Sequence, residues 1–179
     1  RENNLLAGMI MSDKRRVAIL GGGSFGTALA NIVADNGHHA CLWLRNVTDA
    51  EEINQRHINA RYLPDYPLNK NLKATTDLAA ATAKADIVFM SVPSKSCREV
   101  AKELAKVINP TAMLISTTKG IEPTQFKLMS EVLAEELPNQ RLGVMSGPNL
   151  AKEIAARQLT ATVIASRDDV LNKSVQILL

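Results

Sequence analysis

The sequence predicts an α/β domain built on a doubly wound, mostly parallel β-sheet. Short β-branched runs alternate with amphipathic patterns, a glycine-rich turn joins the first pair, and no low-complexity segment interrupts the series. Strands that alternate with helices imply right-handed crossovers, which place helices on both faces of one sheet. A chain of 179 residues is long enough for one such core.

The first strand and helix carry the clearest pattern. Arg16–Leu20 is predicted to be a strand that ends in glycines, and residues 24–37 are predicted to form a helix that ends near Gly37. Five apolar residues fall on one face of that helix, at the spacing of an amphipathic helix. They are Phe25, Ala28, Leu29, Ile32 and Val33.

The same signals place the later elements. Further strands are predicted at Ala40–Leu44, Lys73–Thr76, Asp86–Val92, Ala112–Thr117, Leu142–Met145 and Thr160–Ala165. Two helices are predicted from capping-box spacing, at Thr48 with Glu51 and at Ser96 with Glu99. Others are indicated by Phe126, Met129, Leu133 and Leu137, by Leu150–Ala156, and by the amphipathic end of the chain. The two prolines within residues 59–71 predict a loop.

This pattern divides the chain in two. Residues 1–15 are expected to be a leader without ordered structure, and residues 16–179 to be the folded domain. The last residues lie inside an amphipathic pattern, where domains seldom end, so we expect the chain to be truncated before a further domain.

Composition narrows the class of partner. The net charge is +3 and only 3% of residues are aromatic, which disfavours nucleic acid but suits an anionic small molecule. No apolar run approaches the roughly 18 residues of a membrane span. Cys41 and Cys97 are expected to be free thiols, which favours a cytoplasmic location. His38, His39 and His57 lack the spacing of metal ligands, so no metal site is expected.

The glycine-rich turn predicts a dinucleotide-binding site of the Rossmann type. Gly21, Gly23 and Gly26 match G-x-G-x-x-G between a strand and a helix, which is the context that the motif requires. The first glycine permits a tight turn, the second lets a pyrophosphate approach the backbone, and the third allows close packing of helix and strand. The helix N-terminus then offers free N–H groups to the phosphates.

Arg45 indicates which dinucleotide is expected. NAD-selective folds usually carry Asp or Glu about 20 residues after the loop, to bind the ribose 2′-hydroxyl. Here Arg45 occupies that place, and the next acidic residue is Asp49. An arginine can pair with a 2′-phosphate, so tolerance of or preference for NADPH is expected, with NAD also a cofactor.

Several motifs together resemble the NAD(P)-dependent glycerol-3-phosphate dehydrogenases of bacterial type, over residues 16–179. They are GGGSFGTALA, LWLRN, RYLP, SVPSK, the segment Ser116–Glu122, and SGPNLAKE at Ser146–Glu153. The resemblance implies interconversion of glycerol 3-phosphate and dihydroxyacetone phosphate by hydride transfer, which feeds glycerophospholipid synthesis. It implies cofactor contacts from Ser24, Phe25, Arg45, Tyr62, Lys119 and Ala151, and substrate contacts from Lys119, Gly147 and Asn149.

The resemblance also implies that the general acid is a lysine in a helical C-terminal domain, beyond residue 179. We therefore expect this chain to bind cofactor and to be inactive alone. A homodimer is a further expectation, because a truncated domain exposes an apolar face. Two alternatives remain open: a related 6-phosphogluconate-type or 3-hydroxyacyl-CoA-type dehydrogenase, and a non-catalytic Rossmann module that senses a nucleotide.

Overall fold

A computed structural model describes residues 14–148 and 150–179. Its seven-stranded sheet has the order β3-β2-β1-β4-β5-β6-β7 and is parallel except for the last pair. The strands are β1 (Arg16–Leu20), β2 (His39–Trp43), β3 (Lys73–Thr75), β4 (Ile87–Met90), β5 (Met113–Ser116), β6 (Arg141–Ser146) and β7 (Val163–Ala165). The helices are α2 (Ser24–Asp35), α3 (Val47–Arg56), α4 (Leu78–Thr82), α5 (Ser94–Leu104), α6 (Met129–Glu136), α7 (Ala151–Ala155) and α8 (Asp169–Leu178). The predicted fold class is confirmed.

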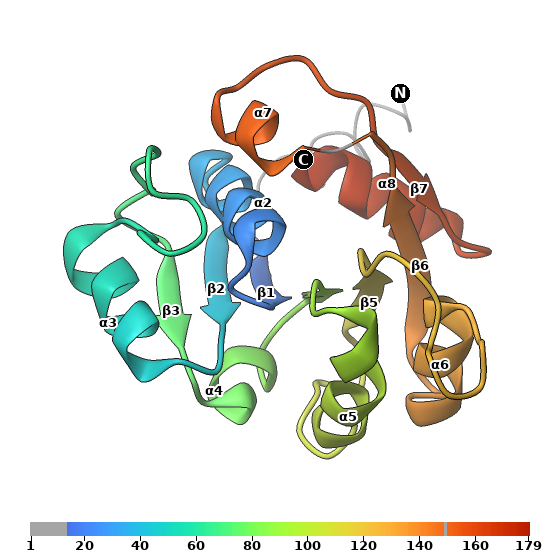
Figure 1. Cartoon of the computed structure of the whole chain (residues 1–179). Coiled ribbons are helices and arrows are strands. Elements are labelled where there is room, and N and C mark those ends of the chain that lie inside the picture. The colour runs from blue at the N-terminus through green and yellow to red at the C-terminus, as the bar shows by residue number, and fades with distance from the viewer. Residues whose placement is uncertain (1–13, 149) are drawn as a thin grey trace.

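Helices cover both faces of the sheet (Figure 1). Alternate residues of each strand enter different hydrophobic clusters, as strand geometry requires. In β1, Val17 and Ile19 join the cluster formed with α2, α3, α7 and α8, whereas Ala18 and Leu20 join the cluster formed with α4, α5 and α6. Because strands such as β4 are buried on both sides, they are continuous apolar runs in the sequence.

The amphipathic stripes pack as the sequence predicts. In α2, Ala28, Leu29 and Val33 are buried, while Phe25 and Ile32 are partly buried against the same cluster. The helix ends at Asp35, two residues before the predicted glycine.

The predicted helix starts need correction, because other residues cap the helices. Asn46, not Thr48, is the N-cap of α3, and its side chain accepts a hydrogen bond from the Asp49 N–H. The helix α5 begins at Ser94, directly after Pro93, so the predicted box at Ser96 and Glu99 lies inside the helix. Phe126 precedes α6, with a φ of 57° and a largely exposed side chain.

The chain's two ends also differ in detail from the predictions. The strand predicted at Thr160–Ala165 comprises only Val163–Ala165 and runs antiparallel to β6. Of the predicted leader, residues 1–13 lie outside the described residues. Arg15 is described, and its carbonyl accepts a hydrogen bond from the His39 N–H at 2.9 Å, which extends the contact between β1 and β2.

Candidate functional site

A cleft of about 720 Å³ opens at the carboxyl ends of the central strands. It lies where the strand order reverses, between β1 and β4, which is the usual ligand site of open α/β sheets. Residues that follow β1, β2, β4 and β5 line the cleft, together with two from the loop after α3. These lining residues are 21–26, 43–46, Asp49, Arg61, Tyr62, 91–93, Lys95, Ser96 and 117–119.

The glycine loop has the geometry that a phosphate site needs. Gly21 has a φ of +125°, and a Cβ there would lie 2.6 Å from the carbonyl oxygen of Ser91. A Cβ on Gly26 would overlap the carbonyl oxygen of Gly21, so only glycine allows this approach of α2 to β1. A Cβ on Gly23 would meet no described atom within 4 Å, so the backbone there is open to the cleft.

The N-terminus of α2 leaves its donors available. Gly23 is the N-cap and, among the described residues, no side chain caps the helix and no acidic residue lies in its first turn. The first N–H groups of a helix have no intrahelical partner, and the helix dipole gives them a partial positive charge. These residues therefore fit the pyrophosphate of a dinucleotide.

The Asn59 side chain anchors the glycine loop, a role that sequence reasoning missed. Its side chain is 1% exposed, and its Nδ2 donates to the Gly22 carbonyl at 3.0 Å and to Thr27 Oγ1 at 2.8 Å. Ser24 Oγ donates to the Tyr62 carbonyl at 2.7 Å, which ties the 59–62 loop to the start of α2. The only sequence signal was an asparagine in a proline-containing loop, which is not specific.

Two arginines lie at the far end of the cleft, beyond β2. Arg45 is exposed, and its guanidinium lies 3.5 Å from the Glu99 carboxylate on α5. Arg61, which was not predicted, lies 3.8 Å from Asp49 and 5.2 Å from the centre of the Tyr62 ring. Among the described residues that line the whole cleft, Arg45, Arg61, Lys95 and Lys119 face one carboxylate, Asp49. Glu99 lies outside the lining and offsets part of this positive charge, and the remainder suits an additional phosphate.

Lys119 lies on the opposite side of the cleft, just after β5. The two threonines before it are fixed to β4: Thr117 Oγ1 donates to the Met90 carbonyl at 3.0 Å, and Thr118 Oγ1 donates to the Val92 carbonyl at 2.9 Å. The exposed Lys119 ammonium is thus carried on an anchored backbone at the carboxyl edge of the sheet.

A partly buried ion cluster anchors the same loop on its other side. Arg98 of α5 pairs in bidentate fashion with Glu122, which is 7% exposed, and also contacts Glu135 at 2.9 Å and Glu136 at 2.6 Å. The hydrogen bonds from Arg98 lower the pKa of Glu122, so this carboxylate stays ionised. Lys119 is therefore held between Thr118 and Glu122. Sequence reasoning did not find this cluster, because the acidic partners lie 24 to 38 residues from Arg98.

Gly147 and Ala151, two further predicted site residues, lie outside the cleft lining. Gly147 is half-buried after β6, and Ala151 is the first residue of α7, which packs against the same cluster as α2. Neither lines the cleft, and Asn149 lies outside the described residues. Their substrate and cofactor roles stay predictions.

Sequence reasoning also missed the segment after β4. Ser91, Pro93 and Lys95 line the cleft, and Ser91 Oγ lies 2.6 Å from Thr117 Oγ1. Their position beside the reversal of strand order was the available signal. Across residues 14–148 and 150–179, no group of His, Cys, Asp or Glu could hold a metal ion, and no helix is long and apolar enough to cross a membrane.

Comparisons with known proteins identify the same fold and motifs. A family model described as the N-terminus of NAD-dependent glycerol-3-phosphate dehydrogenase matches residues 16–172. The chain is 54% identical over 166 residues to a glycerol-3-phosphate dehydrogenase [NAD(P)+] of Teredinibacter turnerae, covering 93% of this chain and 49% of that protein. The corresponding protein of Saccharophagus degradans is 52% identical, with 93% and 46% covered.

A solved structure agrees. The crystal structure of glycerol-3-phosphate dehydrogenase from Coxiella burnetii superimposes with a TM-score of 0.87 at 36% identity, over 93% of this chain and 51% of that one. The chain thus spans about half the length of the relatives that it matches.

Proposed function

This chain belongs to the NAD-dependent glycerol-3-phosphate dehydrogenase family, and on that premise we propose that it is the cofactor-binding half of an enzyme that interconverts glycerol 3-phosphate and dihydroxyacetone phosphate. The match over residues 16–172 argues against the 6-phosphogluconate-type and 3-hydroxyacyl-CoA-type alternatives. The product of reduction would feed glycerophospholipid synthesis.

One observation carries the proposal: the uncapped N-terminus of α2 meets an open backbone at Gly23, at the point where the strand order reverses. The bound nicotinamide nucleotide would donate or accept the hydride. Backbone N–H groups of Gly23, Ser24 and Gly26 would hold its pyrophosphate, with Phe25 packed beside them. Gly21 would shape the turn, because its own N–H donates to the Trp43 carbonyl at 2.9 Å.

The two arginines would bind the adenosine end. Arg45 and Arg61 would pair with a 2′-phosphate, and Tyr62 would lie beside the same ribose. Asp49 offers one carboxylate that could accept from a 2′-hydroxyl, which is consistent with use of both NADP and NAD.

Lys119 would act at the boundary of cofactor and substrate. Its ammonium is a point charge that can hold a substrate oxygen or phosphate without needing a fixed planar geometry. Gly147 and Asn149 would contact the substrate and Ala151 the cofactor, as the SGPNLAKE motif implies. Reduction of the ketone also requires a proton donor for the forming alkoxide, and we propose that this donor lies in the part of the relatives that this chain does not span.

The proposal is tested by assaying NADPH oxidation that depends on dihydroxyacetone phosphate. We expect the 179-residue chain to bind NADPH without turnover, and a protein extended to the length of its relatives to be active. In that longer protein, Lys119→Ala should lower kcat/KM at least tenfold. A nucleotide-sensing module would instead bind NADPH and remain inactive at either length.

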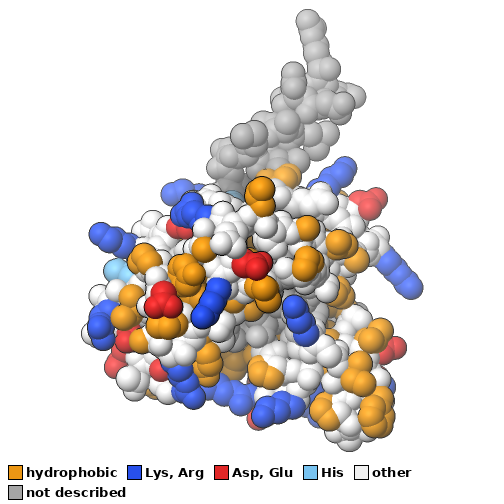
Figure 2. All heavy atoms as spheres, turned by 45° about the horizontal axis from the view of Figure 1, so that its top comes forward, with side chains coloured by type: hydrophobic (Ala, Val, Ile, Leu, Met, Phe, Trp, Pro, Cys, Tyr) orange, Lys and Arg blue, Asp and Glu red, His pale blue; other side chains and the backbone are white. Residues whose placement is uncertain are grey.

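We also propose a cytoplasmic location and self-association. The two cysteines are free, as a reducing compartment would require. Exposed apolar side chains gather around α7, β7 and α8, and such surfaces favour assembly. They are Leu150, Leu159, Val163, Val170, Ile177 and Leu179. The side that carries α7, turned forward in Figure 2, shows hydrophobic side chains interspersed with Lys and Arg. Sedimentation equilibrium tests for a homodimer.

A further inference from the structure

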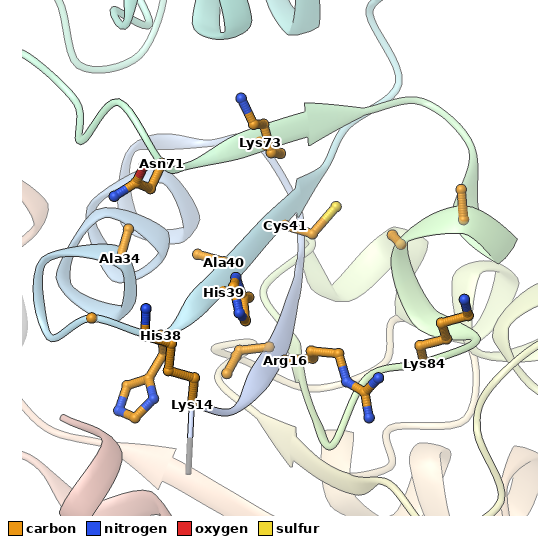
Figure 3. Close-up of a pocket in the computed structure, with 14 residues that line it drawn as sticks. Lys14, Arg16, Ala34, His38, His39, Ala40, Cys41, Asn71, Lys73 and Lys84 are labelled. Atoms are coloured by element: carbon orange, nitrogen blue, oxygen red, sulfur yellow. The ribbon is translucent and has the colours of Figure 1, made fainter. Parts of the chain in front are cut away.

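A second hollow lies at the opposite edge of the sheet, where the strands begin (Figure 3). It has a volume of about 560 Å³ and is bounded by the amino ends of β1, β2 and β3 and by α4. The five-residue helix α4 contributes only the small side chains of Ala80 and Ala81 to the lining. Cys41 of β2 is consequently only half-buried.

The strand register gathers basic side chains on the α4 side of the sheet. Arg16 is in register with His39, and Cys41 is in register with Lys73. Register partners in neighbouring strands, and residues two apart in one strand, lie on the same face. Cys41 packs with the cluster of α4, α5 and α6, so all four residues share that face. Lys84, just after α4, lines the hollow from across it (Figure 3).

The charge of the hollow is strongly positive. No Asp or Glu is among its described lining residues. The basic residues that line it are Lys14, Arg16, His38, His39, Lys73 and Lys84. One carboxylate outside the lining offsets part of this charge: Asp86 lies 3.6 Å from the Arg16 guanidinium. His38 Nδ1 accepts a hydrogen bond from the Arg15 N–H at 3.2 Å, so in the neutral ring Nε2 carries the proton and is a donor.

We propose that this hollow binds a phosphate ester, at a site separate from the dinucleotide cleft. Among the described residues, the basic side chains of the hollow outnumber the one carboxylate paired with them, Asp86, so the hollow attracts an anion. A phosphate group could accept hydrogen bonds from lysine, arginine and histidine there. The hollow is larger than a phosphate needs, and Cys41, Ala80 and Ala81 on the α4 side give it an apolar lining for the carbon part of the ester.

Histidine NMR gives a local readout. The chain has three histidines, of which His38 and His39 line the hollow while His57 lies at the end of α3 and lines neither cavity. Titration with inorganic pyrophosphate should shift the ring signals of His38 and His39 saturably and leave that of His57 unchanged. Binding at the glycine loop alone would not move His38 and His39.

The double variant Lys73→Ala/Lys84→Ala should weaken this binding at least fivefold. Both lysines are exposed, so the fold should be retained, and an unchanged His57 signal checks that it is. The matched control is Lys102→Ala/Lys106→Ala, which removes the same charge from exposed positions on α5 and just after it and should leave the titration unchanged.

Vesicles distinguish the source of the phosphate. A lipid headgroup would be identified if the chain sediments with phosphatidic acid vesicles but not with phosphatidylcholine vesicles. The Lys73→Ala/Lys84→Ala variant should then fail to sediment with either. Pyrophosphate binding without sedimentation would identify a soluble ester. If pyrophosphate leaves His38 and His39 unshifted and no vesicle binds, or if the double variant behaves like the control, the proposal is overturned.

Discussion

Gly23 and Gly26 lie three residues apart in one loop, yet a methyl group would meet different surroundings at each. At Gly26 it would overlap the backbone of Gly21, so Gly26→Ala should destabilise the chain by about 2 kcal/mol or more. At Gly23 it would meet open space and a φ of −70°, so Gly23→Ala should leave the unfolding free energy within about 0.5 kcal/mol of wild type.

The two alanine variants, Gly23→Ala and Gly26→Ala, distinguish an effect on folding from an effect on NADPH binding. In Gly23→Ala the added methyl group would stand where a phosphate approaches, so NADPH affinity should fall about tenfold or more, as loss of a charge-assisted hydrogen bond would predict. Thermal unfolding and calorimetric titration of both variants check this. Normal NADPH binding by Gly23→Ala would show that the phosphates lie elsewhere.

The ion pair of Asp168 predicts that the folded chain loses stability at acidic pH. Hydrogen bonds from Arg141 and from backbone N–H groups lower the pKa of Asp168 from 3.8 to about 2. A carboxylate with a lowered folded-state pKa stabilises the fold above its ordinary pKa, and that contribution is lost as the pH falls towards the folded value. The melting temperature should therefore decrease between about pH 4 and pH 2.

Arg141→Ala is the test of that cause. With the guanidinium removed, the Asp168 pKa should rise towards its ordinary value. The variant should then be less stable at pH 7 and should lose less stability between pH 5 and pH 2 than the wild type. Parallel melting curves for the two proteins over that range would contradict the assignment.

At the scale of elements, the Arg98 cluster predicts coupling between the 117–128 loop and the cofactor site. Glu122→Gln weakens the pairing to Arg98 and releases one of the two anchors around Lys119. NADPH affinity should fall severalfold in Glu122→Gln, and much less in the Lys119→Ala background, because Glu122 acts through Lys119. Additive effects in this double-mutant cycle would mean that Glu122 is structural only.

A control separates that effect from general destabilisation. Arg141→Ala breaks a different and more exposed ion pair, which joins β6 to the start of α8. It should lower the melting temperature without changing NADPH affinity. If Lys119→Ala itself leaves NADPH affinity unchanged, the proposed role of Lys119 is contradicted, regardless of the effect of Glu122→Gln.

Helices and strands could be predicted where the pattern of apolar residues extended over several turns or over a whole strand. Their boundaries could be predicted where a single residue type marked the start or the end. The strand at Arg16–Leu20 matches the prediction at both ends. The helix starts were misplaced because Asn46 and Pro93 compete with nearby capping-box patterns. The five-residue helix α4 was not predicted, because its alanine-rich sequence shows no period. Asn59 and Arg98 act through long-range contacts, which spacing along one chain does not reveal.

At the scale of the whole molecule, one sheet presents two edges with different chemistry. The carboxyl edge carries the glycine loop, two arginines and Lys119, and the amino edge carries the basic hollow. The parallel topology of β1 to β6 produces this separation, because the residues that follow these strands meet at one edge and those that precede them meet at the other. The chain spans about half the length of the relatives that it matches.

Calorimetric titration of NADPH, and then of NADH, into the 179-residue chain tests the central claim most directly. We predict saturable binding with NADPH at least as tight as NADH, and an Arg45→Ala variant that loses about tenfold in NADPH affinity while NADH affinity changes little. Tighter NADH binding that Arg45→Ala does not alter would contradict the assignment of Arg45. No saturable binding of either dinucleotide would contradict the cleft at the β1–β4 reversal as the cofactor site of this chain.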